Sequence, residues 1–350
     1  MKAITVVPGK ANSVNLEQFD EPAAGEGSVL VETIAVGICG TDLEITSGEY
    51  GWAPPGHERL VLGHESIGRV RDAPSGSGLA EGDYVVGIVR RPDPVPCYNC
   101  AAGEWDFCRN GQYTEHGIKS LDGFMREHYR ADAEALVKID AKLGELGVLL
   151  EPTSVVAKAW EQAEHVGARA TWHPRVAVIT GAGPIGLLAA LIGVQKGLEV
   201  HVFDQVTEGL KPDLVRQLGA TYHTGPIEQS VEGPDVIIEC TGVPTLVFDA
   251  IEHVGSGGVV CLTGVSPTGR SLTIDAGIVN RSMVLSNEGV VGSVNANRRH
   301  YEQAAAALAG ADAGWLGRLI TRKVPIDDFA QAFDRQPDDV KVVLQISAGG

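Results

Sequence analysis

The 350-residue sequence lacks the features that define several large classes of protein. No apolar run approaches the roughly 18 residues that a membrane-spanning helix needs. Positive charge is scarce: the net charge of −17 disfavours nucleic acid and anionic membranes, both of which bind to positive patches. The first residues have no long apolar stretch and no small-residue cleavage site of a signal peptide. The sequence therefore predicts a cytoplasmic protein that binds neither nucleic acid nor membrane.

Cysteine is also too sparse for a disulfide scaffold, since six cysteines in a chain of this length do not form a small-domain framework. Three of them cluster as Cys97, Cys100 and Cys108. In a reducing compartment this spacing indicates a metal site. Cys240 and Cys261 fall on predicted strands, where we expect core positions.

The length exceeds what one hydrophobic core usually supports, so the sequence predicts two domains. Residues 1 to about 150 contain short Val/Ile-rich segments broken by Gly, Pro and Asp, for example residues 29–36 and 83–89. Such segments are typical of an antiparallel, barrel-like β domain.

The pattern changes after Glu151 and Pro152. A predicted helix is followed by apolar strands that alternate with helices; the helix covers residues 154–166, and the strands cover residues 175–180, 199–204, 235–240 and 258–262. This alternation predicts an α/β fold with a parallel, doubly wound sheet. A final strand at residues 341–346 is expected to return to the first domain. The predicted domains are residues 1–153 with 296–350, and residues 154–295.

A glycine-rich segment follows the first of these strands and opens a helix. Gly181, Gly183 and Gly186, with Pro184 and Ile185 between them, fit the G-x-G-x-x-G pattern. In this context the pattern indicates a dinucleotide site, because the glycines let the backbone approach the pyrophosphate at a helix N-terminus. Asp204 ends the next strand, where a carboxylate contacts the ribose 2′-hydroxyl and repels a 2′-phosphate. We therefore expect NAD rather than NADP. Two alternatives stay open: the glycine-rich segment is a turn that binds no ligand, and Asp204 only caps its strand.

Four residues form a candidate metal-ligand set: Cys39, the adjacent pair His64 and Glu65, and the distant Glu151. A thiolate, an imidazole and carboxylates suit a catalytic zinc, which takes three protein ligands and keeps one position open. Zinc together with a nicotinamide cofactor means alcohol oxidation or carbonyl reduction. Taken singly, Cys39 could be a small core residue, the His-Glu pair a surface feature, and Glu151 the end of an element before a proline.

Two segments resemble the zinc-containing medium-chain dehydrogenase/reductase superfamily: residues 63–70 (GHESIGRV) and residues 82–86 (GDYVV). The resemblance implies a β-rich, GroES-like catalytic domain and a Rossmann domain. Residues 117–127, 149–152 and 291–295 resemble the glucose (aldose) 1-dehydrogenase branch. This narrower resemblance implies a sugar substrate whose C1 hydroxyl is oxidised to the lactone. It also implies a homodimer or homotetramer paired through the apolar segments 283–285 and 289–292.

The resemblance also implies residue roles. Cys39 and His64 would bind zinc, and Glu65 and Glu151 would bind it in exchange with water. Thr41 resembles the hydroxyl that relays the substrate proton. The remaining candidate substrate contacts are Asp42, which would orient the relay, and Glu115 and Asn295, which would face the sugar or the nicotinamide edge.

Relatives with a structural zinc use four cysteines in a short lobe, and Cys97, Cys100 and Cys108 match the last three. The first would fall near Pro94, which has no ligand atom, while Asp93 beside it offers an oxygen. The lobe therefore either holds a second zinc through Asp93 and three cysteines or is metal-free. His116 is another conceivable fourth ligand.

Three rival functions remain open. A zinc-dependent alcohol or polyol dehydrogenase would use the same chemistry on another substrate. A zinc-free reductase of the same superfamily would not need Cys39, His64 and Glu65. A non-enzymatic dinucleotide-binding protein would not need Thr41.

Overall fold

The computed structural model describes residues 1–267, 269 and 271–347. The chain divides into two compact units: unit 1 is Met1–Ser154 with Asn295–Gly350, and unit 2 is Val155–Val294. The last three residues of the predicted first domain lie outside the described residues. Among the described residues, no helix is both long enough and apolar enough to cross a bilayer.

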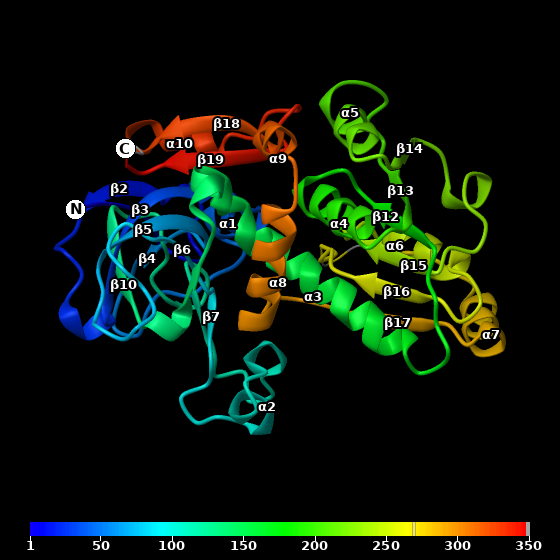
Figure 1. Ribbon diagram of the computed structural model, residues 1–350, viewed down its shortest axis with the longest axis horizontal. Coiled ribbons are helices and arrows are strands. Elements are labelled where there is room, and N and C mark those ends of the chain that lie inside the picture. Colours follow the sequence, from blue (N-terminus) through cyan, green and yellow to red (C-terminus); the bar gives the residue numbers. More distant parts are fainter. Residues whose placement is uncertain (268, 270, 348–350) are drawn as a thin grey trace. The chain divides into compact units, whose positions relative to one another are not determined.

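Unit 1 is built around a seven-stranded sheet in the order β11-β6-β5-β3-β19-β18, with β10 pairing β3 (Figure 1). Its strands are β3 Val29–Gly37, β5 Glu65–Asp72, β6 Tyr84–Gly87, β10 His128–Ala131, β11 Leu136–Lys138, β18 Ile320–Pro325 and β19 Lys341–Gln345. All pairs are antiparallel except β18 with β19. The late strand β19 pairs with the early strand β3, so the chain returns to its first domain as predicted.

Two three-stranded sheets complete the β structure of unit 1. They contain β1 Lys2–Val6, β2 Asn15–Gln18 and β4 Leu60–Val61, and β7 Arg90–Arg91, β8 Thr114–His116 and β9 Ser120–Leu121. Phe124, Met125 and Tyr129 are fully buried among Val and Leu side chains from these strands. Each such side chain stabilises the fold by about 1.5–3 kcal/mol through burial. The helices of unit 1 are α1 Gly40–Ser47, α2 Tyr98–Ala101, α8 Arg298–Ala309, α9 Ala313–Leu319 and α10 Ala330–Phe333.

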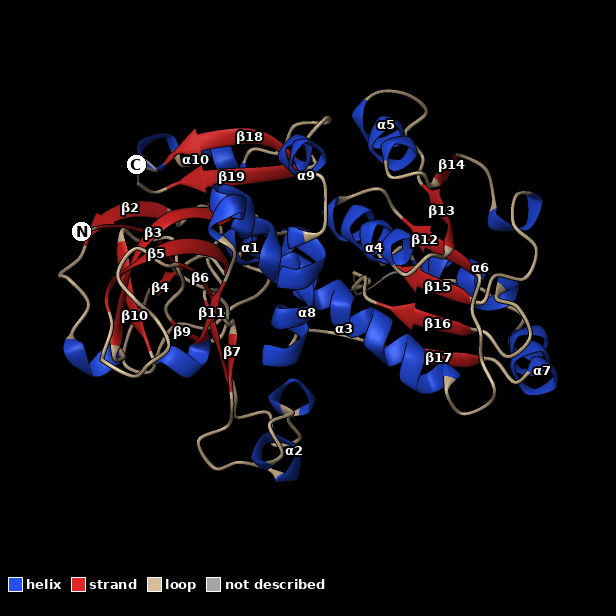
Figure 2. Ribbon diagram, viewed as in Figure 1, coloured by secondary structure: helices blue, strands red, loops and turns tan. Residues whose placement is uncertain are grey.

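Unit 2 contains one six-stranded parallel sheet in the order β14-β13-β12-β15-β16-β17, drawn with its helices in Figure 2. The strands are β12 Val176–Thr180, β13 Glu199–Phe203, β14 Thr221–His223, β15 Val236–Glu239, β16 Val259–Leu262 and β17 Gly289–Gly292. The helices are α3 Leu150–Gly167, α4 Pro184–Gln195, α5 Leu210–Gln217, α6 Pro244–His253 and α7 Ala276–Ser286. This strand order reverses at β12, as in doubly wound dinucleotide-binding sheets. The predicted α/β fold class is confirmed.

Helix α3 begins four residues before the predicted start. Glu151 therefore lies in the first turn of a helix, and the alternative that it merely ends an element is wrong. Pro152 is accommodated because the backbone N–H groups of a first helical turn have no partner within the helix. Further along, Trp160 donates from Nε1 to the Ala189 carbonyl at 3.1 Å, which ties α3 to α4 within unit 2.

Candidate active site

Cys39 lies at the junction between β3 and α1 and is the N-cap residue of that helix. Asp42, in the first turn, accepts the backbone N–H of Cys39 at 2.8 Å with its Oδ2 atom. This bond closes the start of the helix and fixes the backbone of Cys39. Oγ1 of Thr41 lies 4.0 Å from Sγ of Cys39. Thr41 is therefore next to the candidate ligand, as a proton relay would need.

His64 and Glu65 meet Cys39 at the start of β5. The three residues each offer one ligand atom, and these atoms lie within 4.8 Å of one another. Nδ1 of His64 lies 3.5 Å from Oδ1 of the fully buried Asp42, which leaves Nε2 for a metal ion. Burial lowers the pKa of His64, but the Asp42 carboxylate and the Cys39 sulfur outweigh it and raise that pKa well above its usual value.

Asp42 therefore accepts a hydrogen bond from the backbone of Cys39 and faces the ring of His64. A carboxylate behind a metal-bound histidine is a common way of orienting the ring. Its predicted contact with the relay or substrate stays a prediction.

Glu65 has a partner that the sequence analysis missed. Nζ of Lys341, at the start of β19, donates to the two carboxylate oxygens of Glu65 at 2.8 and 2.6 Å and to the Ile38 carbonyl at 3.2 Å. Both side chains are buried. A Cβ atom at Gly37 would lie 2.1 Å from Oε2 of Glu65, so the carboxylate needs a glycine there. Lys341 balances a negative charge that the candidate ligand set would otherwise leave uncompensated.

Glu151 is buried in the first turn of α3. Burial raises the pKa of its carboxyl to about 7; the charge of His64 opposes this rise, and the charge of Glu65 adds to it. These electrostatic contributions place Glu151 in the neighbourhood of the three clustered residues, although it does not belong to the cluster itself. Its role as the distal ligand stays a prediction.

The donor set at Cys39, His64 and Glu65 fits a zinc ion. It combines sulfur, nitrogen and oxygen atoms, all of which zinc accepts. The three side chains converge, and the histidine presents one ring nitrogen while a carboxylate faces the other. Binding of a metal would displace the proton that the imidazole otherwise holds.

Glu115 and Asn295, the two candidate sugar contacts, lie against each other. Oε1 of Glu115 accepts hydrogen bonds at 3.0 Å from Nδ2 of Asn295 and from Nε of Arg90. Asn295 adopts a left-handed backbone conformation with φ of 60°. The buried carboxylate is thus paired with a cation and held in one orientation.

The glycine-rich segment forms the turn between β12 and α4 in unit 2. Gly183 is the N-cap residue of α4, and Pro184 opens the helix with Ile185 behind it. A Cβ atom at Gly186 would lie 1.8 Å from the Gly181 carbonyl oxygen, so no other residue fits that position. The N–H groups of the helix start have no partners within the helix and suit a phosphate.

Asp204 lies beside this turn at the end of β13. Its Oδ2 atom accepts the N–H of Ala182 at 2.7 Å, and its Oδ1 atom accepts the N–H of Val206 at 3.0 Å. Nζ of Lys211, on α5, lies 3.7 Å from Oδ2. The carboxylate therefore has a cation next to it, which the sequence analysis did not find.

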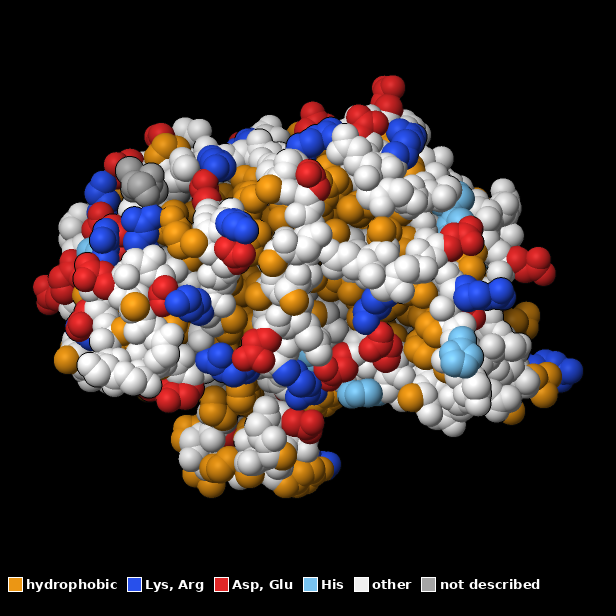
Figure 3. Space-filling view, viewed as in Figure 1, with side chains coloured by type: hydrophobic (Ala, Val, Ile, Leu, Met, Phe, Trp, Pro, Cys, Tyr) orange, Lys and Arg blue, Asp and Glu red, His pale blue; other side chains and the backbone are white. Residues whose placement is uncertain are grey.

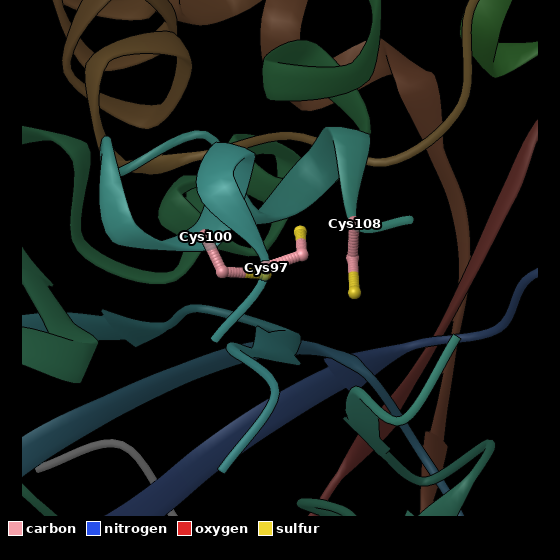
Figure 4. Close-up of side chains that lie close together, drawn as sticks. All are labelled: Cys97, Cys100 and Cys108. Carbon is pink, nitrogen blue, oxygen red and sulfur yellow. The ribbon is translucent and has the colours of Figure 1, made fainter. Parts of the chain in front are cut away.

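Figure 4 shows Cys97, Cys100 and Cys108 close together in the lobe that carries α2; their sulfur atoms lie within 4.8 Å of one another. Oδ2 of the buried Asp93 lies 4.0 Å from Sγ of Cys108. Backbone N–H groups, first that of Arg109, lower the pKa of Cys97 to about 6. The lobe therefore brings three sulfur donors together, with the Asp93 carboxylate next to one of them, and the role of Asp93 as a fourth ligand stays a prediction.

His116 does not complete this lobe. Its Nδ1 atom lies 2.6 Å from the Asp122 carbonyl, and its Nε2 atom lies 3.0 Å from Nη2 of Arg91. Burial and the charge of Arg91 lower the pKa of His116 well below its usual value. Both ring nitrogens are engaged elsewhere, so the alternative of His116 as the fourth ligand is wrong.

Two protein-family models match this chain. Residues 144–346 match the family model described as glucose dehydrogenase C-terminus, and residues 25–141 match the alcohol dehydrogenase GroES-like domain. The chain belongs to the glucose dehydrogenase family. The predicted GroES-like and Rossmann combination is confirmed, and the chain is a dehydrogenase rather than a non-enzymatic dinucleotide-binding protein.

The relatives span the whole chain. Glucose 1-dehydrogenase of Methanocella arvoryzae is 40% identical and covers 99% of this chain and 100% of that protein. Glucose 1-dehydrogenase 1 of Caldivirga maquilingensis is 42% identical, with 99% of both chains covered. A solved structure of Haloferax mediterranei glucose dehydrogenase, in complex with NADP, Zn and gluconolactone, is 33% identical. It aligns with a TM-score of 0.91 over 99% of this chain and 100% of that chain.

Proposed function

We propose that the chain is a zinc-dependent glucose 1-dehydrogenase. It would oxidise the C1 hydroxyl of glucose or a similar aldose to the lactone and transfer the hydride to NAD(P). The observation that carries this proposal is the convergence of Cys39, His64 and Glu65 within 4.8 Å, beside Thr41, in a member of the glucose dehydrogenase family. Gluconolactone in the related Haloferax mediterranei enzyme supports the product.

Different residues of this chain would bind the metal and transfer the proton. Cys39, His64 and Glu65, with Glu151 as distal ligand, would hold zinc, which supplies a Lewis acid that lowers the pKa of the substrate hydroxyl. The hydroxyl of Thr41 would take up the released proton and pass it outward.

Glu115 and Asn295 would hold the sugar through its other hydroxyls, while the turn at Gly181–Gly186 holds the dinucleotide. Fixing both reactants in one orientation supplies much of the rate enhancement in such a transfer.

The test is an assay of nicotinamide reduction with purified enzyme, a panel of aldoses, polyols and simple alcohols, and identification of the product. We expect glucose-like aldoses to be oxidised fastest and the lactone to appear. Cys39→Ser and Thr41→Val should lower kcat by at least about 100-fold, as expected for loss of a ligand or a proton relay. Faster turnover of a polyol than of every aldose would instead support the polyol dehydrogenase alternative.

We also propose that NAD is preferred over NADP. Asp204 would face the ribose 2′-hydroxyl and repel a 2′-phosphate. Lys211 stands 3.7 Å from the same carboxylate and would reduce this preference without reversing it. Dissociation constants measured by fluorescence should favour NAD for the native chain, and Asp204→Asn should tighten NADP binding about 10-fold. An unchanged NADP affinity in Asp204→Asn would show that this carboxylate does not select the cofactor.

The proposal includes a homodimer or homotetramer. Exposed apolar side chains gather on α7, where Ile278, Val284 and Leu285 are 58–64% exposed, next to the edge strand β17. The cysteine lobe also carries apolar side chains at its surface, coloured orange at the bottom of Figure 3. Large exposed apolar patches mark interaction sites. Sedimentation of a monomer at micromolar concentration would exclude this assembly.

Two further proposals concern the cysteines. The lobe would hold a second zinc through Asp93, Cys97, Cys100 and Cys108, and metal analysis should find two zinc ions per chain. All six cysteines are free thiols, which suits the reducing cytoplasm, where we place the protein. Fractionation of cells that express the native protein would test this location.

A further inference from the structure

Two aromatic side chains are exposed together after helix α1. Tyr50 is 41% and Trp52 is 49% exposed, and their ring centroids lie 5.0 Å apart in an edge-to-face arrangement of 73°. The other four tryptophans are buried or half-buried. Single exposed apolar residues need no explanation, but paired rings leave a large apolar area in water. The exposed pair of Tyr50 and Trp52 therefore indicates a surface that binds a ligand or a partner.

The loop that carries this pair is held rigidly. The N–H of Trp52 donates to the Ile118 carbonyl at 2.9 Å, and the Trp52 carbonyl accepts from Ser120 at 2.9 Å. Gly51, with a φ of 96°, packs against Ile45 of helix α1. The rings are thus presented on a backbone fixed from both sides, which reduces the entropy lost when a ligand binds.

The same loop leads directly to the candidate active site. Residues 117–120, which bond to Trp52, follow Glu115 on β8. Gly117 lies so close to Gly63 that a Cβ atom on it would be 2.4 Å from the Gly63 carbonyl oxygen. Gly63 immediately precedes His64. Trp52, Glu115 and His64 are therefore connected through one short set of backbone contacts within unit 1.

The electrostatic surroundings of Tyr50 agree with this placement. Burial raises the pKa of its hydroxyl, and the charge of Glu115 raises it further, while Arg90 opposes the rise. Tyr50 is thus near the carboxylate that we propose as a sugar contact. An aromatic surface next to a fixed carboxylate and the amide of Asn295 combines apolar area with hydrogen-bonding groups.

A pyranose has the complementary chemistry. Its ring carries C–H bonds, which are attracted to the negative face of an aromatic ring, and hydroxyls, which bond to carboxylate and amide groups. We propose that Trp52, supported edge-on by Tyr50, is a stacking platform for the pyranose ring of the substrate and determines the specificity of the site for cyclic sugars. This inference rests on the proposed function, since it names how that substrate is held.

The kinetic test compares Trp52→Ala with Trp52→Phe, which keeps an aromatic face, and with the matched control Phe19→Ala, which removes an exposed aromatic ring outside the site. We expect Trp52→Ala to raise KM for glucose about 10-fold while kcat and the dissociation constant for NAD change less than about 2-fold. Trp52→Phe should recover most of the loss, and Phe19→Ala should behave like the native chain. An unchanged KM in a folded Trp52→Ala enzyme would overturn the proposal.

A binding experiment separates this inference from the proposed function. The fluorescence of the native enzyme is titrated with 1,5-anhydroglucitol, a pyranose without a C1 hydroxyl, and with the open-chain polyol sorbitol. We expect the cyclic sugar alone to change the emission, and Trp52→Phe to abolish that change. If glucose is not oxidised but this signal is present, the proposed function is wrong and the stacking platform at Trp52 is supported. If glucose is oxidised and no signal appears, or if sorbitol gives the same signal, the platform is refuted.

Discussion

Replacing Lys341 with methionine would remove one half of a buried ion pair and leave the other half in place. Nζ of Lys341 lies 2.6 Å from Oε2 of Glu65, and the side chains are 2% and 1% exposed. Methionine keeps the length of the side chain but has no charge, so Glu65 would remain as an uncompensated buried anion. Breaking a buried pair in this way costs about 3–5 kcal/mol. Lys341→Met should therefore lower the folded-to-unfolded ratio by about two to four orders of magnitude.

The assay is equilibrium urea unfolding of zinc-stripped protein, followed by tryptophan fluorescence. Lys341→Met should lower the midpoint without changing the slope with denaturant. Lys323→Met is the matched control: Lys323, on the neighbouring strand β18, pairs with Glu145 but is 44% exposed, so its loss should cost less than about 1 kcal/mol. Adding Glu65→Gln to Lys341→Met should restore at least half of the lost stability, because residue 65 then carries no unpaired buried charge.

Either of two results would show that the buried pair of Lys341 and Glu65 does not stabilise the fold in this way. One is a decrease in the free energy of unfolding of Lys341→Met that is no larger than the decrease in Lys323→Met. The other is a double variant, Lys341→Met with Glu65→Gln, that is no more stable than Lys341→Met alone.

Three further predictions concern other parts of the chain. Gly186→Ala should destabilise the protein because its Cβ would lie 1.8 Å from a carbonyl oxygen, whereas Gly183→Ala, with open space around it, should keep the melting temperature and weaken only NAD binding in a titration. In zinc-stripped protein, Glu151 keeps a proton in the folded state up to a pKa of about 7, against an ordinary 4.5 when unfolded. The free energy of unfolding should therefore fall by about 3 kcal/mol as the pH rises from 4.5 to 7, and urea titrations of Glu151→Gln should show no such slope. Alkylation of Cys97 in zinc-stripped protein should have a midpoint near pH 6, and mass spectrometry should find it protected when zinc is added; equal labelling with zinc would exclude Cys97 as a ligand.

Local patterns predicted the elements of unit 2 well. The strand, glycine turn and helix at Val176–Gln195 follow each other in the sequence, and each is dictated by neighbouring residues. The start of α3 was predicted four residues too late because Pro152 suggested a break, although a proline is tolerated in a first helical turn. Boundaries of this kind depend on which N–H groups lack partners, which the sequence alone does not state.

Partners that are distant in sequence could not be predicted. Lys341 and Glu65 are 276 residues apart, and Lys341 begins a strand whose next three residues are apolar. A buried lysine in that position signals a buried anion, but the sequence offers 45 acidic residues to choose from. Lys211 beside Asp204 was missed for a similar reason, since only the packing of α5 brings the two together.

The pairing of Glu65 with Lys341 also has a consequence during biosynthesis. Cys39, His64 and Glu65 emerge early from the ribosome, whereas the lysine that neutralises Glu65 is added 276 residues later. At about 5–20 residues per second, this interval lasts about 15–55 s. Throughout that time the nascent chain carries the Cys39 thiol, the His64 imidazole and the Glu65 carboxylate without Lys341, and β3 lacks its neighbour β19. A cation captured in this interval would be bound before the site has its final charge.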